Sequence, residues 1–309
     1  MLDEYSTPAT IALAALWALL IAASVIVWRH NCQKPNRELV QRTQSWWVMI
    51  ALFSGALVAG KGLMVTLFGV ISFLALKEFF SLIATRRADR HVLLWAYLTI
   101  PIQYFWIYTG WYGMFVIFIP VYMFLGIHVR MLLTGHTEGF IRSASTIQWG
   151  MMVCIYTVSH AAYLLVMPEA SGDMQMGASL LLYLVFLTQF NDVAQYVWGK
   201  CFGKHKVSPN ISPNKTWQGL LGGVATTTLL AWLLAPYLTP FSAFDAILGG
   251  LLIGFGGFFG DITLSAVKRD IGVKDMGKTI PGHGRILDRI DSLTFTAPLF
   301  LHFIRYFYY

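Results

Sequence analysis

Apolar residues along the chain fall into about ten runs, separated by short polar segments that carry most of the charge. The runs lie at about 8–28, 46–60, 62–82, 92–108, 115–133, 147–166, 178–198, 220–238, 247–259 and 293–304. Most have roughly the length that a helix needs to cross a hydrocarbon core of about 30 Å, whereas a membrane β-barrel would show short alternating segments. The pattern predicts an all-α, polytopic transmembrane bundle. We expect ten spans, or nine if the short run at 46–60 is a re-entrant or interfacial piece.

Composition supports a membrane protein. The 309 residues are 57% hydrophobic and 12% charged, with a mean hydropathy of +0.61, whereas soluble domains carry about 25% charged residues. The three cysteines, Cys32, Cys154 and Cys201, lie far apart and show no spacing typical of zinc or redox sites. The net charge of +7 is spread over several loops, which favours membrane orientation and phosphate binding over nucleic-acid binding.

The distribution of Lys and Arg predicts the orientation of the chain. Segments 29–45, 86–91, 130–142, 199–217 and 261–291 hold 19 of the 22 basic residues. If ten spans alternate, all five segments lie on one face, and short positive loops remain cytosolic. We therefore expect a multi-pass protein of the bacterial inner membrane with a cytosolic charged face and the N-terminus outside.

No internal repeat or soluble domain is evident, so residues 1–309 are expected to form one integral membrane domain. Within it, 1–176 would form a lipid-facing scaffold and 177–309 would carry the catalytic loops.

Charge is densest between Gly260 and Ser292, where five carboxylates, six basic residues and a histidine occur. Asp261 follows a glycine-rich run, and Asp288 and Asp291 are three residues apart, which would place them on one face of a helix. Converging carboxylates are costly without a cation, and hard oxygen ligands near phosphates are typical of Mg²⁺ sites. The residues predict a magnesium site at Asp261, Asp288 and Asp291. The alternative is a plain interfacial network of ion pairs with the neighbouring bases.

Basic residues in the same block could neutralise a triphosphate. Those in question are Lys268, Arg269, Lys274 and Arg289; the alternative is contact with lipid headgroups. His283 lies between two glycines, which allow a ligand to approach the backbone closely. Polar pairs within or near the ends of apolar runs are further candidates, Lys77–Glu78 and Asn191–Asp192. The repeated Ser-Pro around Lys215 favours a fixed, extended loop.

These motifs resemble the phosphatidate cytidylyltransferase (CDP-diacylglycerol synthase) family. Its signature is met by the following residues: Ser265, Lys268, Arg269, Lys274, Asp275, Pro281, Gly282, His283, Gly284, Asp288, Arg289 and Asp291. A second family motif is met by a separate set: Asn191, Asp192, Tyr196, Gly199, Ser212, Pro213, Lys215, Thr216 and Gly219. The similarity is strong in the C-terminal half, and the N-terminal half matches mainly as hydrophobic spans.

The resemblance implies an Mg²⁺-dependent nucleotidyltransferase of phospholipid biosynthesis that converts CTP and phosphatidate to CDP-diacylglycerol and pyrophosphate. It leaves room for a second cation such as K⁺ and for a homodimer. The implied catalytic residues are Lys268, Arg269, Asp275, His283 and Asp288, to which the charge pattern adds Asp261. The implied substrate-binding residues are Asp192, Lys215, Lys268, Arg269, Lys274 and Arg289. Asp261 and Asp288 would be the first-choice metal ligands, with Asp192, Asp275 and Asp291 in reserve.

Two positions depart from the family pattern. Arg285 stands where a second glycine is usual, and Leu264 stands where many members have a glutamate. Two alternatives remain open at this point: a CTP-dependent transferase or kinase acting on another lipid or polyprenol, and a non-catalytic lipid-binding or transport paralogue.

Overall fold

The computed structural model describes residues 7–33, 37–83, 86, 89–167, 176–272 and 285–309. The described chain is all-α apart from one short antiparallel hairpin of β1 (Lys206–Ser208) and β2 (Ser212–Thr216). The first half contains α1 (Thr7–Gln33), α2 (Arg37–Ala59), α3 (Lys61–Leu82), α4 (Arg90–Tyr108), α5 (Tyr112–Ile117), η2 (Phe118–Met123), α6 (Phe124–Leu132), α7 (Phe140–Met151), η3 (Met152–Tyr156) and α8 (Thr157–Val166). The second half contains α9 (Met176–Phe202), α10 (Trp217–Leu238), α11 (Ala243–Asp270), α12 (Leu287–Ile290) and α13 (Leu293–Tyr308).

Seven stretches of the described chain are long and apolar enough to cross a membrane. They are Pro8–Cys32, Lys61–Leu82, Tyr112–Leu132, Phe140–Val166, Met176–Phe202, Trp217–Leu238 and Ala243–Asp270. Three other long helices, α2, α4 and α13, coincide with the remaining predicted runs. Helix α13 has 16 residues, which is shorter than a full span requires. The multi-pass helical membrane architecture is therefore confirmed, with seven candidate spans where the sequence predicted nine or ten.

Two spans contain a π-helical segment instead of a continuous α-helix. The segment η2 joins α5 to α6 and includes Pro120, and η3 joins α7 to α8. Proline lacks the N–H that an α-helix needs and its ring crowds the preceding turn, so a locally wider helix relieves the conflict in η2.

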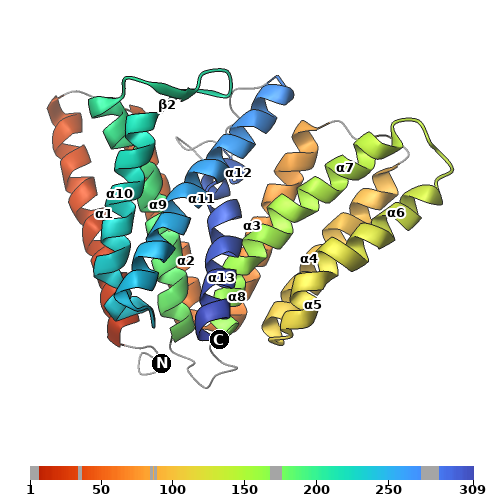
Figure 1. Ribbon diagram of the computed structural model, residues 1–309, viewed down its shortest axis with the longest axis horizontal. Helices are drawn as coiled ribbons and strands as arrows, with labels where there is room; N and C mark the ends of the chain where they lie inside the picture. The colour runs from red at the N-terminus through yellow and green to blue at the C-terminus, as the bar shows by residue number, and fades with distance from the viewer. Residues whose placement is uncertain (1–6, 34–36, 84–85, 87–88, 168–175, 273–284) are drawn as a thin grey trace.

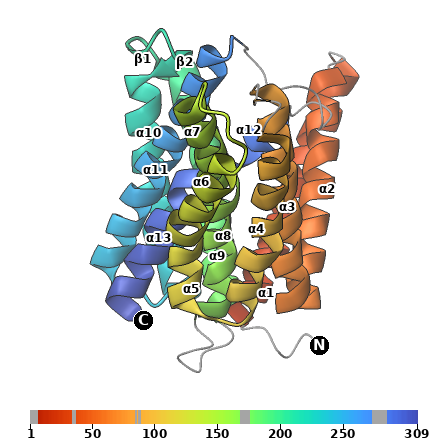
Figure 2. The same cartoon turned by 90° about the vertical axis from the view of Figure 1, so that its right-hand side faces the viewer.

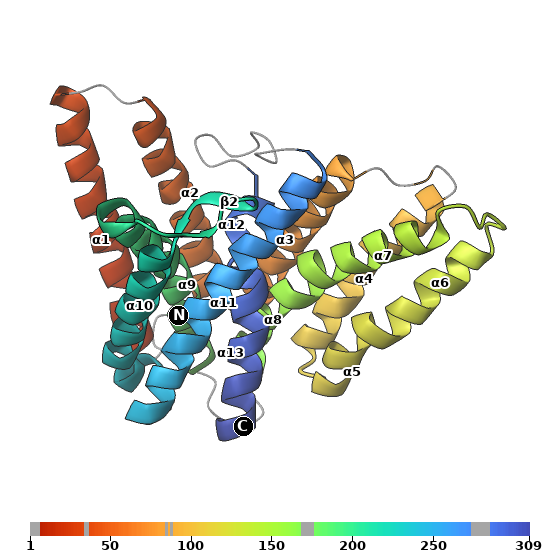
Figure 3. The same ribbon diagram turned by 45° about the horizontal axis from the view of Figure 1, so that its top comes forward.

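The second half of the chain forms the most closely packed part of the bundle, in which α9 lies against α10, α11 and α13. Glycines let α9 and α10 approach: a Cβ atom on Gly223 would overlap the side chain of Gln195. The strand β2 crosses the end of these helices, beside α11 (Figures 1 and 3). Figure 2 shows that α4 to α7 stand in front of this unit as a separate layer.

Successive helices alternate in direction, so the described parts of all five basic segments lie at one end of the bundle (Figure 1, top). That end also holds the hairpin, the C-terminus of α11 and the residues around α12. Large apolar side chains remain exposed along the helices, such as Ile26 on α1 and Leu229 on α10. In a bundle of this hydropathy, such faces are those that contact lipid.

Candidate active site

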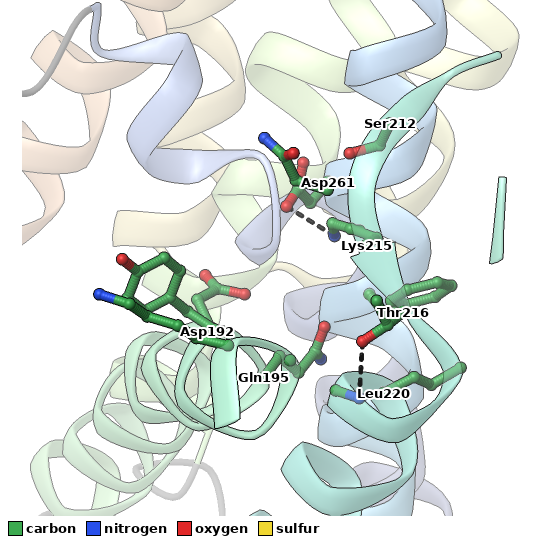
Figure 4. A pocket seen from close by; sticks show the side chains of 13 residues that line it. Asp192, Gln195, Ser212, Lys215, Thr216, Leu220 and Asp261 are labelled. Atoms are coloured by element: carbon green, nitrogen blue, oxygen red, sulfur yellow. Dashed lines mark hydrogen bonds and ion pairs between the residues drawn. The ribbon is translucent and has the colours of Figure 1, made fainter. Parts of the chain in front are cut away.

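The hairpin places Lys215 against the charged end of α11. Lys215 Nζ lies 2.6 Å from Asp261 Oδ2 (Figure 4) and 4.7 Å from the centre of the Phe258 ring. The next residue, Thr216, is the N-cap of α10: its hydroxyl accepts a hydrogen bond of 3.1 Å from the Gly219 amide. This N-cap fixes where the strand ends and therefore where the preceding lysine lies.

Three aspartates from separate elements interact at this end of the bundle: Asp192 of α9, Asp261 of α11 and Asp291 just after α12. Ser292 connects two of them, because its hydroxyl donates to Asp192 Oδ1 at 2.9 Å and its amide donates to Asp291 Oδ1 at 2.8 Å. A glycine lets α11, which carries Asp261, come close to Asp291: a Cβ atom on Gly260 would overlap the carbonyl oxygen of Asp291. The fold therefore brings together carboxylates that are up to 99 residues apart in sequence.

Negative charge exceeds positive charge around Asp291, as the pKa of its carboxyl shows. Loss of hydration raises the pKa of Asp291 well above its usual range, and the negative charges of Asp261 and Asp192 raise it further. The Ser292 amide and the positive charge of Lys268 oppose this effect. Like charges held together in a partly buried site favour binding of a proton or a cation.

The chemistry of the donor set fits Mg²⁺, which prefers carboxylate oxygens. Within the described ranges, no group of three His, Cys, Asp or Glu side chains already stands close enough to enclose a metal ion. Lys215 neutralises part of the charge of Asp261, and the remaining repulsion around Asp291 is what a divalent cation would relieve.

Asp288 makes a different set of hydrogen bonds from these three aspartates. It pairs with Lys268, with 3.0 Å between Nζ and Oδ1, and it accepts a hydrogen bond of 3.3 Å from the Arg285 amide. Lys268 follows Asp261 by seven residues on α11, which is roughly 10 Å along a helix axis. The described contacts link Asp192, Asp261 and Asp291, and Lys268 lies within electrostatic reach of Asp291 while it pairs with Asp288.

Of the other predicted site residues, the structure describes Arg269 and Arg289. Arg269 Nε donates to the Ile211 carbonyl at 3.1 Å and so ties α11 to the hairpin. Arg289 lies within electrostatic reach of Asp192, and among the described residues its buried Nε has no hydrogen-bond partner. Lys274, Asp275 and His283, with Lys278, Pro281, Gly282 and Gly284, lie outside the described residues.

A cavity of about 490 Å³ opens beside Asp192, Lys215 and Asp261. Figure 4 shows the side chains of α9, β2 and α11 turned toward it. Its lining comprises Asp192, Gln195, Tyr196, Gly199, Lys200, Ser212, Asn214, Lys215, Thr216, Gly219, Leu220, Phe258 and Asp261. Gln195 was missed by sequence reasoning. It follows Asp192 by three residues, so helical spacing alone would have placed it on the same face.

The two departures from the family pattern occupy different environments. Leu264 is 2% exposed and packs in the hydrophobic core. Arg285 is partly exposed, and its Nη1 donates to Ser81 Oγ of α3 at 2.9 Å.

Comparison with known proteins identifies the family. The model of the Cytidylyltransferase family matches residues 40–307. The chain is 45% identical over 298 residues to the Escherichia coli K12 protein named "Uncharacterized protein YnbB", a match that covers 95% of this chain and 97% of the relative. Two proteins named phosphatidate cytidylyltransferase match over a shorter stretch. The Haemophilus influenzae protein is 40% identical over 42% of this chain and 47% of its own length, and the Synechocystis protein is 49% identical over 37% and 39%.

The family match covers most of the chain and includes every described residue of the site, from Asp192 to Ser292. The described geometry agrees with it, since acids and bases meet beside a cavity at the end of a membrane bundle. The chain therefore belongs to the cytidylyltransferase family.

Proposed function

We propose that this protein transfers the cytidylyl group of CTP to phosphatidate and forms CDP-diacylglycerol and pyrophosphate. The observation that carries the proposal is the cavity bounded by Asp192, Lys215 and Asp261 at one end of a membrane bundle. Acids suited to a cation and a lysine suited to phosphate border the same space. The phosphatidate cytidylyltransferases that the chain resembles in part give the substrate class.

The reaction needs little covalent chemistry from the protein. An oxygen of the lipid phosphate attacks the α-phosphorus of CTP and forms a new phosphorus–oxygen bond. The bond between the α-phosphorus and the oxygen bridging to the β-phosphorus breaks, and pyrophosphate leaves with the electron pair. Because the nucleophile is already anionic, positioning and charge neutralisation supply most of the catalysis.

Asp192, Asp261 and Asp291 would hold Mg²⁺, with Asp275 and Asp288 as further candidates from the family motif. When bound, the ion would neutralise phosphate charge as the leaving group departs. Lys215 would contact a phosphate in the cavity, close to where it now pairs with Asp261.

The bases of α11 and α12 would serve the same anionic substrates. Lys268 would hold Asp288 and neutralise pyrophosphate, and Arg269 would keep the hairpin over the cavity. Arg289 has an unpartnered Nε among the described residues and would bind a phosphate group. Lys274 and His283 would contribute phosphate contacts, as the family motif implies.

The concentration of basic segments at one end supports a cytosolic site in a bacterial inner membrane. CTP would then arrive from the cytosol, and phosphatidate would enter from the adjoining leaflet with its acyl chains between the lipid-facing helices.

The test uses purified full-length protein with labelled CTP and phosphatidate, with and without Mg²⁺. We expect CDP-lipid and pyrophosphate in equal amounts, and neither without the metal. Release of CDP with a phosphorylated lipid would instead identify a CTP-dependent kinase. Binding of lipid without turnover of CTP would identify a non-catalytic paralogue.

A further inference from the structure

Helix α3, in the N-terminal half of the chain, is bonded directly to the start of α12. Glu78 Oε2 accepts a hydrogen bond of 3.0 Å from the Leu287 amide, across 209 residues of sequence. One turn further along α3, Ser81 accepts the bond from Arg285 described above. Figure 1 shows the upper part of α3 beside α12.

The Glu78 contact satisfies a donor that α12 cannot satisfy itself. Leu287 is the first residue of α12, and the first amides of a helix have no partner within it. Glu78 is 8% exposed and Leu287 is fully buried, so water cannot easily replace the carboxylate. Loss of an acceptor at a buried donor leaves that donor unpaired and costs the full desolvation penalty of the group.

The anchored segment carries the site. Asp288, Arg289 and Asp291 follow Leu287 within four residues, and Ser292 then bonds Asp192. Any shift of Leu287 is passed to Asp291 over a single helical turn, since α12 has only four residues. The position of Asp291 within the acidic cluster therefore depends on where α3 holds α12.

We infer that Glu78 is a positioning residue of the active site, holding α12 so that Asp291 stays within the Asp192–Asp261 cluster. This rests on the proposed function, in which that cluster binds Mg²⁺. Glu78 itself reaches α12 through the Leu287 amide and not through the reacting groups. Polar partners that orient ligand-bearing groups commonly change metal affinity or activity by about 10- to 100-fold when they are removed.

The experiment compares Glu78→Leu with Glu78→Gln in the full-length protein. Leucine removes the acceptor at similar bulk, whereas glutamine retains an oxygen for the Leu287 amide. Asp89→Asn is the matched control. Asp89 is a fully buried acid in the N-terminal half, and it is paired with Arg86 and Ser143 away from α12.

Two quantities are measured: hydrogen exchange of the peptide covering 285–291, and the Mg²⁺ concentration that gives half-maximal activity. We expect Glu78→Leu to exchange faster and to need about tenfold more Mg²⁺ or higher, with activity recovering at high Mg²⁺. Glu78→Gln should resemble the wild type, and Asp89→Asn should lower thermal stability without changing the Mg²⁺ requirement.

Unchanged exchange in Glu78→Leu would overturn the inference, as would faster exchange with an unchanged Mg²⁺ requirement. If the wild type makes no CDP-lipid, the proposed function fails. The positioning role of Glu78 is then tested by whether Mg²⁺ alone slows hydrogen exchange of the 285–291 peptide. Protection present in the wild type and Glu78→Gln but lost in Glu78→Leu supports positioning. Equal behaviour of all three proteins overturns it.

Discussion

Lys215 and Asp261 face each other across the candidate site, with 2.6 Å between Nζ and Oδ2. The pair joins a hairpin at the end of the bundle to the C-terminal half of α11. Each partner is only partly exposed, with 18% of the lysine and 29% of the aspartate side chain accessible. The same two groups are therefore both a structural link and the charges that a metal–nucleotide substrate would meet.

Asp261→Asn should reduce CDP-lipid formation by about 100-fold or more. A metal ion provides several kcal/mol of charge stabilisation, and each ~1.4 kcal/mol is a factor of ten in rate. The measurement is the initial rate at saturating Mg²⁺. Asp245→Asn is the control, because Asp245 lies near the opposite end of α11 and its carboxylate bonds Ser242 and Tyr308; equal losses in both variants would refute the role of Asp261.

Lys215→Ala should lower turnover by roughly 10- to 100-fold, since a hydrogen bond to a charged group contributes about 1.5–3 kcal/mol. It should also lower the melting temperature without Mg²⁺, because Asp261 loses its counter-charge. Lys206→Ala on the same hairpin is the control, as its side chain is exposed. Wild-type turnover in Lys215→Ala would exclude the lysine from substrate binding.

Asp291→Asn should abolish activity while leaving thermal stability in EDTA unchanged or higher. Burial and the charges of Asp261 and Asp192 hold the Asp291 pKa well above its usual range, so a neutral side chain of similar shape removes a repulsion. Mg²⁺ should stabilise the wild type, by about 2.7 kcal/mol at one hundred times its dissociation constant, and should stabilise the variant much less. Thermal melts with Mg²⁺ and with EDTA test this, and equal Mg²⁺ stabilisation of both proteins would contradict it.

Gly260→Ala should impair both folding and activity. Its methyl group would overlap the Asp291 carbonyl, and overpacking typically costs about 1–3 kcal/mol. Gly126→Ala is the control, since among the described residues no atom outside its chain neighbours and its own helix backbone lies within 4 Å of its added carbon, and alanine favours a helix by about 0.5–1 kcal/mol. Melting temperature and activity are measured together. A Gly260→Ala protein that matches the wild type in both would show that Asp291 tolerates displacement.

The amino-acid sequence by itself determined the membrane architecture and the family. Apolar runs of this length predict helices that cross lipid, because a helix satisfies its own backbone N–H and C=O groups where no water is present. The paired motifs around Lys215 and from Ser265 to Asp291 identified the family that the whole-chain comparison confirms. The sequence also predicted metal ligands among Asp261, Asp288 and Asp291, with Asp192 in reserve.

Only the tertiary structure decided which of these acids meet. Spacing predicts that Asp288 and Asp291 share a helix face; the structure adds that Asp288 pairs with Lys268 and that Ser292 links Asp291 to Asp192. Nor could spacing reveal that Glu78 of α3 caps the helix that carries them. Helical periodicity relates residues within one turn or two, whereas contacts between helices depend on packing, and here on glycines that let α11 approach the Asp291 backbone.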